Sequence, residues 1–296
     1  MDGDTGMDAS LQPGEEARQR LSAGPVTSDL SVDELGLLET LGLRPLGLAL
    51  GSSIYHVGWQ RARVMDNTEL TVLSQAMHTA REYALKRMLA EAGELGADGI
   101  VGVRLTLQQP AWGSGLIEFI AMGTAIGGTG GAGAPAGRQP FASNLSGQDF
   151  WKLRRYGYQP VGLAFGCCVY HVAHLGLQKW MQQIGRNAEM TSFTQATYDA
   201  RELAMARMGA DAREAGGDLV VGVSLNEGTW GWDANVIEFS CLGTAVTRDP
   251  QRPEPPQPQL VLGMQSGGGA TASLGAAAGL SPQAPGTATP LFRPKS

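Results

Sequence analysis

The sequence predicts an α+β fold of two tandem β-α-β-β domains, each preceded by a short helix. The first observation behind this prediction is an internal repeat, since residues 28–126 (repeat 1) match residues 143–247 (repeat 2) motif by motif. The second is the order of hydrophobic periods in each repeat, in which a β-prone stretch precedes one long helical segment and two short strands. A repeat of about one hundred residues is too long for a solenoid unit and indicates a duplicated domain.

The repeated motifs occur in the same order in both copies. Gly51 in repeat 1 corresponds to Gly166 in repeat 2, and Thr71 corresponds to Thr191. Further matching pairs are Tyr55-His56-Val57 with Tyr170-His171-Val172, Ala80-Arg81-Glu82 with Ala200-Arg201-Glu202, and Ile117-Glu118-Phe119 with Ile237-Glu238-Phe239. Each element expected in repeat 1 is therefore expected again in repeat 2.

A short helix is predicted at the start of each repeat. Ser31, followed three residues later by Glu34, forms a capping box, and Gly42 ends the helix because glycine readily adopts the left-handed conformation. Repeat 2 keeps this pattern at Ser146, Asp149 and Gly157.

A β-prone stretch and a long helix come next in each repeat. The stretches 46–57 and 161–172 are predicted to be strands with a bulge or bend, because glycines interrupt them. Residues 69–93 carry apolar side chains at spacings of three and four, which is typical of an amphipathic helix. Gly96 and Gly216 are expected to end the long helices. The strands that follow are predicted at 99–107 and 116–126 in repeat 1, and at 219–227 and 236–246 in repeat 2.

Such a domain leaves one face of its sheet without cover, because a single long helix protects only the other face. Burying the uncovered face against a second copy of the domain is the natural remedy. We therefore expect a homo-oligomer.

Three segments outside the repeats lack hydrophobic periodicity. Residues 1–27 and 248–296 are predicted to be disordered tails, and 127–142 a flexible Gly/Ala/Pro linker. The last six residues, 291–296, place two apolar side chains beside two cations. They fit either an unstructured end or a docking peptide for a protein partner.

Charge and composition exclude several classes of protein. The net charge of -6 provides no basic stripe for phosphates, so a nucleic-acid partner is not expected. No apolar run is long enough to span a membrane, and the acidic first residues do not fit a signal peptide. Three cysteines, two of them adjacent, indicate reduced thiols rather than a disulfide framework. We therefore expect a cytoplasmic protein.

An ordered series of motifs is shared with a known family. The series comprises Ala80-Arg81-Glu82-x-Ala84, the run 95–103 (Leu-Gly-Ala-Asp-Gly-Ile-Val-Gly-Val) and Gly123-Thr124-Ala125-Ile126, with counterparts beginning at Ala200, Gly216 and Gly243. This series resembles the YbjQ-like family, often labelled putative heavy-metal-binding domains, over residues 43–126 and 158–247.

The resemblance implies small domains of the dodecin-like type that assemble into closed rings and carry a metal-binding label. Typical single-domain members form pentamers. A tandem chain could form two stacked five-domain rings from five chains, or one six-domain ring from three chains.

One candidate metal site lies in repeat 2. Cys167, Cys168, His171 and His174 place two thiols and two imidazoles within eight residues, a set that suits zinc or copper. On a regular strand Cys167 and His171 would lie about 13 Å apart, so chelation needs a bend or ligands from a neighbouring subunit. Repeat 1 offers only His56 at the equivalent position. The alternative is that the cysteines are small buried hydrophobes and the histidines are structural.

Two carboxylates are candidates for acid-base work. Glu118 and Glu238 each lie between an isoleucine and a phenylalanine, where burial could raise the pKa of a carboxyl group. The alternative is ordinary strand alternation, with each glutamate facing water or an interface arginine. The candidate arginines are Arg81, Arg87, Arg201 and Arg207.

No sequence motif establishes an enzyme. The Gly-rich run 127–133 is not followed by the Lys-Ser/Thr pair of a phosphate loop, and no Ser-His-Asp set can be assembled. We therefore predict a non-enzymatic, ring-forming protein that binds a metal or small ligand or acts as a scaffold. The alternative is a small enzyme that uses Glu118 or Glu238 in an inter-domain pocket.

Overall fold

The computed structural model describes residues 24–56, 67–108, 116–129, 139–172, 191–229 and 236–249. They belong to one compact unit, Met1–Glu254. Repeat 1 contains α2 (Val32–Thr40), β1 (Leu43–His56), β2 (Thr68–Glu69), α3 (Thr71–Glu94), β3 (Gly99–Gln108) and β4 (Leu116–Gly128). Repeat 2 and the segment before it contain β5 (Phe141–Ala142), α4 (Gly147–Arg155), β6 (Tyr158–His171), α6 (Thr191–Glu214), β7 (Leu219–Thr229) and β8 (Val236–Arg248).

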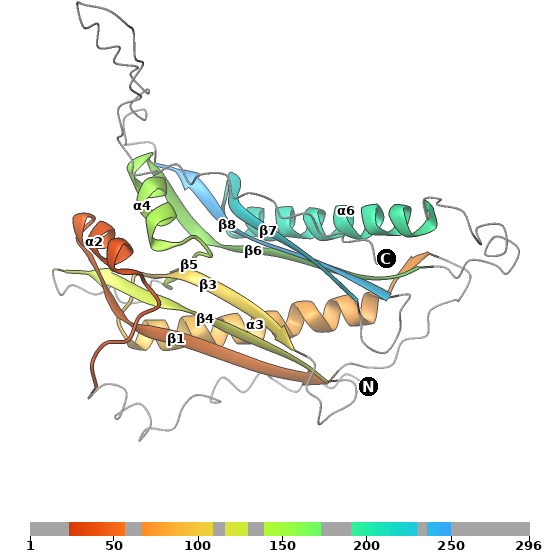
Figure 1. Ribbon diagram of the computed structural model, residues 1–296, viewed down its shortest axis with the longest axis horizontal. Coiled ribbons are helices and arrows are strands. Elements are labelled where there is room, and N and C mark those ends of the chain that lie inside the picture. The colour runs from red at the N-terminus through yellow and green to blue at the C-terminus, as the bar shows by residue number, and fades with distance from the viewer. Residues whose placement is uncertain are drawn as a thin grey trace, which may run out of the picture. The chain divides into compact units, whose positions relative to one another are not determined.

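The predicted β-α-β-β order is confirmed in both repeats (Figure 1). Each repeat forms an antiparallel sheet with its last strand in the middle, in the order β1-β4-β3 or β6-β8-β7. The predicted bulges are also present, since the register shifts between Pro45 and Gly47 and between Pro160 and Gly162.

The predicted helix ends are confirmed as well. Ser31 and Glu34 form a complete capping box at α2, and the Ser146 side chain accepts from the backbone N–H of Asp149 at α4. Gly96 and Gly216 follow the long helices with φ of 71° and 80°, a conformation that other residues adopt at a cost.

Each long helix packs directly against a glycine in the strand beneath it. A Cβ at Gly51 would be 2.0 Å from the carbonyl oxygen of Ala84 in α3. A Cβ at Gly166 would be 1.8 Å from the carbonyl oxygen of Ala204 in α6. The absence of a side chain therefore sets how closely helix and sheet approach in both repeats.

The two repeats exchange short strands. Strand β2 of repeat 1 adds to the edge of β6, where Glu69 pairs with Tyr170. Strand β5, which precedes repeat 2, adds in parallel to β3, where Phe141 pairs with Gly99. Each sheet therefore has four strands, the fourth being β5 from the segment before repeat 2 in one sheet and β2 from repeat 1 in the other.

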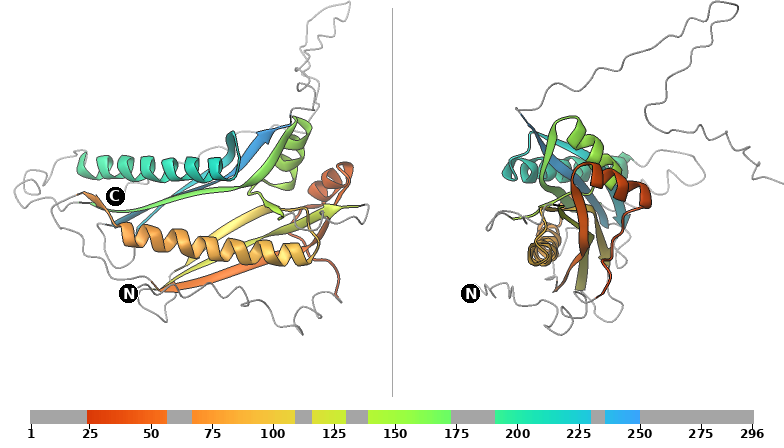
Figure 2. Two further views of the ribbon diagram at one scale, coloured as in Figure 1. Left: turned by 180° about the vertical axis from the view of Figure 1, so that it is seen from behind. Right: turned by 90° about the vertical axis from the view of Figure 1, so that its left-hand side faces the viewer.

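Helix α3 lies between the two sheets. One side of α3 packs on β1 and β4, and another side contacts β6 of repeat 2. Helix α6 packs on β6 and β8, and the two long helices run along their sheets in Figure 2. A single hydrophobic core joins Met77 of α3 with Phe165 and Val169 of β6. The layers are therefore the repeat 1 sheet, α3, the repeat 2 sheet and α6.

The predicted linker and tails lie mainly outside the described residues. Where the structure describes their ends, β4 continues to Gly128, β5 occupies Phe141–Ala142, and β8 continues to Arg248. The assignments of 1–27 and 248–296 as disordered tails, and of 127–142 as a linker, stay predictions.

Candidate functional site

The adjacent cysteines of β6 point into different cores. Cys167 belongs to the core that contains α3, and its Sγ lies 3.6 Å from the carbonyl oxygen of Ser74. Cys168 belongs to the core beneath α6. Burial raises the pKa of each thiol to about 12. Because alternate residues of a strand face opposite sides of the sheet, the two thiols do not converge on one point.

The histidines of the predicted metal site lie near the strand ends. His171 is buried at the end of β6, where it pairs with Thr68, and His56 is exposed at the end of β1. His174 lies outside the described residues. Within the described ranges, no group of three or more His, Cys, Asp or Glu side chains could hold a metal ion. Metal binding by this set stays a prediction.

Glu118 and Glu238 occupy equivalent places in different surroundings. Glu118 lies opposite Ile54, whose side chain is exposed. Glu238 lines a cavity of about 600 Å³, whose walls also include Met77 of α3 and Phe119 of β4. Burial raises the pKa of Glu238 to about 7. The same motif has therefore produced a half-enclosed carboxylate in repeat 2.

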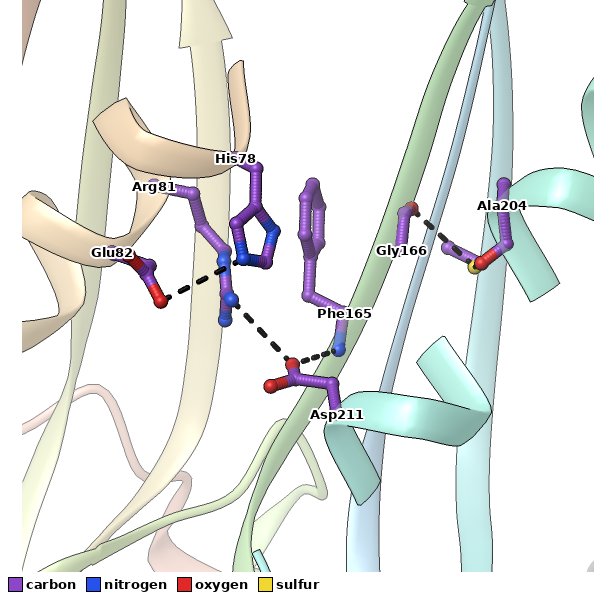
Figure 3. A network of polar contacts seen from close by, with 8 residues as sticks. His78, Arg81, Glu82, Phe165, Gly166, Ala204 and Asp211 are labelled. Carbon is purple, nitrogen blue, oxygen red and sulfur yellow. Dashed lines mark hydrogen bonds and ion pairs between the residues drawn. The ribbon is translucent and has the colours of Figure 1, made fainter. Parts of the chain in front are cut away.

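An ion pair joins the repeats beside Phe165. Arg81 of α3 is buried and lies 3.5 Å from the carboxylate of Asp211 in α6, with its guanidinium 4.8 Å from the centre of the Phe165 ring. The same carboxylate accepts the backbone N–H of Phe165 at 2.8 Å. Figure 3 shows this network, with the nearby contact between His78 and Glu82. Asp211 therefore binds both strand β6 of its own repeat and helix α3 of repeat 1.

A second ion pair joins the exchanged strand to α6. Glu69 of β2 lies 2.7 Å from the guanidinium of Arg207, which also donates to the carbonyl oxygen of Cys167. The hydrogen bond from Arg207 to Glu69 raises the pKa of Arg207. Farther along α3, the Ser74 hydroxyl accepts the backbone N–H of Val169 at 3.0 Å.

Two of the helix arginines have acidic partners within the chain. Arg81 binds Asp211 and Arg207 binds Glu69. The pairing of helix arginines with Glu118 and Glu238 across an interface between subunits stays a prediction. The alignment of the repeats carried the missed signal. It matches Asp211 to Glu91, so that an acid recurs ten residues after Arg81 and ten residues after Arg201.

The face of the repeat 1 sheet that points away from α3 is only partly covered. We call this the open face; its side chains include Leu50, Ser52, Ile54, Glu118 and Ile120. Leu50 is 48% exposed and Ile54 is 51% exposed. Their counterparts in repeat 2, Phe165 and Val169, are 3% and 0% exposed because α3 covers them.

Comparisons with known proteins agree with a duplicated domain. The sequence model of a family described as "Putative heavy-metal-binding" matches residues 52–128 and 162–249. A Mycobacterium tuberculosis protein named as an encapsulin nanocompartment protein is 44% identical over 261 residues, which cover 87% of this chain and 99% of that protein. UPF0145 proteins of Methanosarcina acetivorans and Archaeoglobus fulgidus are each 36% identical, over 88 and 86 residues. These matches cover 28% and 27% of this chain, and 81% and 78% of the two relatives.

The names of the family and its relatives describe binding and compartment proteins rather than enzymes. Among the helices that the structure describes, none has the length and apolar character needed to cross a membrane.

Proposed function

This chain belongs to the YbjQ-like family as a tandem member, and we propose that it is a non-enzymatic subunit that assembles head to tail with its own copies into a closed ring. One observation carries the proposal: each repeat has a surface equivalent to one that forms the contact between the repeats, and these two equivalent surfaces lie outside that contact. Repeat 1 offers the open face, and repeat 2 offers the outer side of α6. A contact of this heterologous kind closes into a ring when its rotation permits.

Equivalent residues support this reuse of the contact. Within the chain, α3 covers Phe165, and in the assembly α6 of one copy would cover Leu50 of the next. On β3, Val103 is 2% exposed beneath repeat 2, whereas its counterpart Val223 on β7 is 42% exposed. Burial of exposed apolar side chains would supply the main driving force for association.

Charges also match across the proposed contact. Arg201 of α6 corresponds to Arg81, and Glu91 of α3 corresponds to Asp211. Glu91 accepts the backbone N–H of Leu50 at 2.8 Å, just as Asp211 accepts that of Phe165. In the assembly, Arg201 of one copy would bind Glu91 of the next.

The exchanged strands also have counterparts at the free ends. Inside the chain, Phe141 of β5 packs on Gly99, where a Cβ would lie 2.3 Å from its ring. The corresponding pair is Val26 and Leu219, both exposed. Val26 is smaller than its counterpart Phe141, and Leu219 is larger than its counterpart Gly99, so the two changes in size compensate. Parallel addition of Val26 to the β7 edge of a neighbouring copy would use this compensation.

The proposed contact favours a six-domain ring over two stacked five-domain rings. Because contacts within and between chains would alternate around the ring, the ring would contain an even number of domains. Three chains would close a six-domain ring. Two stacked five-domain rings would instead require the repeats of one chain to lie in different rings.

Native mass spectrometry of Leu50→Asp tests the assembly. We expect wild-type protein to give a closed oligomer, with three times the chain mass of 31.1 kDa as the expected species. Leu50→Asp should give monomer with unchanged circular dichroism, because an exposed side chain contributes little to the fold. The matched control is Leu203→Asp. Leu203 is exposed on α6, and its counterpart Tyr83 contacts Tyr55 of its own repeat.

A charge exchange identifies the partners. Arg201→Glu should dissociate the ring, and adding Glu91→Arg should restore it, because the ion pair is then reformed with opposite polarity. A monomeric wild-type protein, or a ring indifferent to both Leu50→Asp and Arg201→Glu, would overturn the proposal.

The assembly is proposed to serve a protein nanocompartment in the cytoplasm. Support comes from the relative of that name, which matches this chain over nearly its whole length. The segment 291–296 is the proposed docking peptide for a compartment protein. Deleting 291–296 should leave the ring intact and abolish co-purification with the compartment; unchanged co-purification would refute the peptide's role.

Metal binding and acid-base catalysis are two further candidate functions. The family description supports binding of zinc or copper by Cys167, His171 and their neighbours, which metal analysis of chelator-free ring tests directly. The cavity at Glu238 supports the alternative of a small acid-base enzyme, because a carboxyl with a pKa of about 7 suits proton transfer.

A further inference from the structure

The cavity beside Glu238 has the size and lining of a small-molecule site. It lies between the edge of the repeat 1 sheet and the inner face of the repeat 2 sheet, and its volume is about 600 Å³. Ligand sites combine mainly apolar walls with a few polar groups that fix orientation. Apolar walls come from Met77, Val103, Leu107, Phe119 and Phe165. The polar lining residues are Glu238, Ser240, Asn226, Ser224, Thr106, Asn144 and Arg104.

Glu238 is the polar group that defines the ligand. Among the described residues its carboxylate has neither a hydrogen bond nor an ion pair, and burial alone raises its pKa, to about 7. An ionised carboxylate that is largely withdrawn from water is costly unless a cation or donor satisfies it. A ligand that supplies a cation would therefore gain both pairing and apolar contact.

The other charged or titratable groups near Glu238 do not take this place. Arg104 of β3 lines the cavity, but its guanidinium forms an ion pair with Asp29. Cys167 of β6 is close enough to interact with Glu238, and burial keeps its thiol protonated by raising its pKa to about 12. The lining residues from α3 and β7 are uncharged.

We propose that this cavity binds a compact apolar molecule carrying one protonated amine, whose nitrogen donates to the Glu238 carboxylate. The side chains of Ser240 and Asn226 offer further acceptors to the same nitrogen. The aromatic rings of Phe119 and Phe165, which meet edge to face at 6.4 Å, provide an apolar wall for the body of the ligand. The site lies within one chain, so it does not depend on the proposed ring.

The chain provides a natural comparison at Ser240. Its counterpart in repeat 1 is Ile120, which lies beside the equivalent glutamate on the open face. An isoleucine in place of Ser240 would fill part of the cavity. The fold accommodates it at this strand position, because repeat 1 has Ile120 there.

Benzylamine is a suitable probe, with benzyl alcohol as its neutral analogue. At about pH 8, we expect saturable binding of one benzylamine per chain, measured by calorimetry and by NMR shifts of the Met77 methyl group. Glu238→Gln should weaken benzylamine binding at least tenfold and leave benzyl alcohol binding unchanged. Ser240→Ile should weaken both. Glu227→Gln, which removes an exposed carboxylate from β7, should alter neither.

Lowering the pH separates pairing with the carboxylate from simple apolar binding. Since Glu238 must be ionised to bind the amine, benzylamine should bind about tenfold more weakly at pH 6 than at pH 8. The affinity of Glu238→Gln should not follow this change. Absence of saturable benzylamine binding by the wild type, or equal affinity in folded Glu238→Gln, overturns the proposal.

Discussion

Strands β1 and β6 share one fold position and differ in what lies above them. Phe165 and Val169 of β6 are buried beneath α3, whereas Leu50 and Ile54 of β1 are about half exposed. Each strand carries the same bulge and contacts its own helix through the same glycine. The difference in burial therefore reflects the neighbouring repeat and not the local fold. An apolar surface without cover from the same chain fits a contact with another copy.

Truncating equivalent residues should have unequal effects on stability. Phe165→Ala should lower the free energy of unfolding by about 4 kcal/mol, because it removes a buried aromatic ring from the shared core. Leu50→Ala should lower that of the dissociated chain by less than about 0.5 kcal/mol, because half of its side chain is already in water.

Urea denaturation at low protein concentration measures both changes. Equal losses for Phe165→Ala and Leu50→Ala would mean that the open face is covered within the single chain. That result would remove the difference on which the assembly depends.

The buried carboxyl of Glu238 should make the stability of the folded chain depend on pH. The folded chain keeps the Glu238 proton up to about pH 7, whereas the unfolded chain releases it near 4.5. The free energy of unfolding should therefore fall as pH rises from 4.5 to 7, by about 3 kcal/mol, and then level off. Glu238→Gln should abolish this fall and be the more stable protein at pH 8.

Stability curves of dissociated protein at several pH values provide the measurement. Glu118→Gln is the matched control, because its carboxylate lies on the open face. An identical pH profile for wild type and Glu238→Gln would show that the carboxylate reaches water freely.

The secondary structure was predictable because local signals decide it. The capping box at Ser31, the N-cap hydrogen bond at Ser146 and the glycines at 96 and 216 define helix ends by short-range hydrogen bonds and backbone conformation. The spacing of apolar residues in 69–93 predicted α3, observed at Thr71–Glu94. Duplication strengthened every assignment, since each pattern occurs twice.

The candidate site was less predictable because it depends on which repeat meets which. The motif Ile-Glu-Phe is identical around Glu118 and Glu238, so sequence alone could not indicate that only Glu238 borders the described cavity. Strand β2 has two residues, too few for any periodicity. Alternation along β6 explains why Cys167 and Cys168 face opposite sides, but the sequence does not indicate which core receives each.

The glycines beneath the helices should behave alike in both repeats. Gly51→Ala and Gly166→Ala each place a methyl group about 2 Å from a helix carbonyl oxygen, so the helix must move away from the sheet. Each should lower the free energy of unfolding by about 2 kcal/mol, because overpacking forces backbone shifts. The measurement is again urea denaturation of the dissociated chain. A large effect at only one glycine would show that the helix-sheet contact is not equivalent in the two repeats.

The smallest expected effect concerns one hydroxyl group and its counterpart. Ser74→Ala removes the acceptor of the Val169 N–H and should lower the free energy of unfolding by about 1 kcal/mol at any protein concentration. Thr194 occupies the same helix position in α6, where its hydroxyl would meet the N–H of Ile54 in the next copy. Thr194→Ala should therefore be neutral in the dissociated chain.

Concentration distinguishes the two hydroxyl groups. In thermal melts at concentrations that populate the assembly, Thr194→Ala should lower the melting temperature relative to wild type, because the contact then contributes to stability. The shift should disappear on dilution, whereas that of Ser74→Ala should persist. If Thr194→Ala is neutral in the assembled protein as well, copies associate without reproducing the contact between α3 and β6.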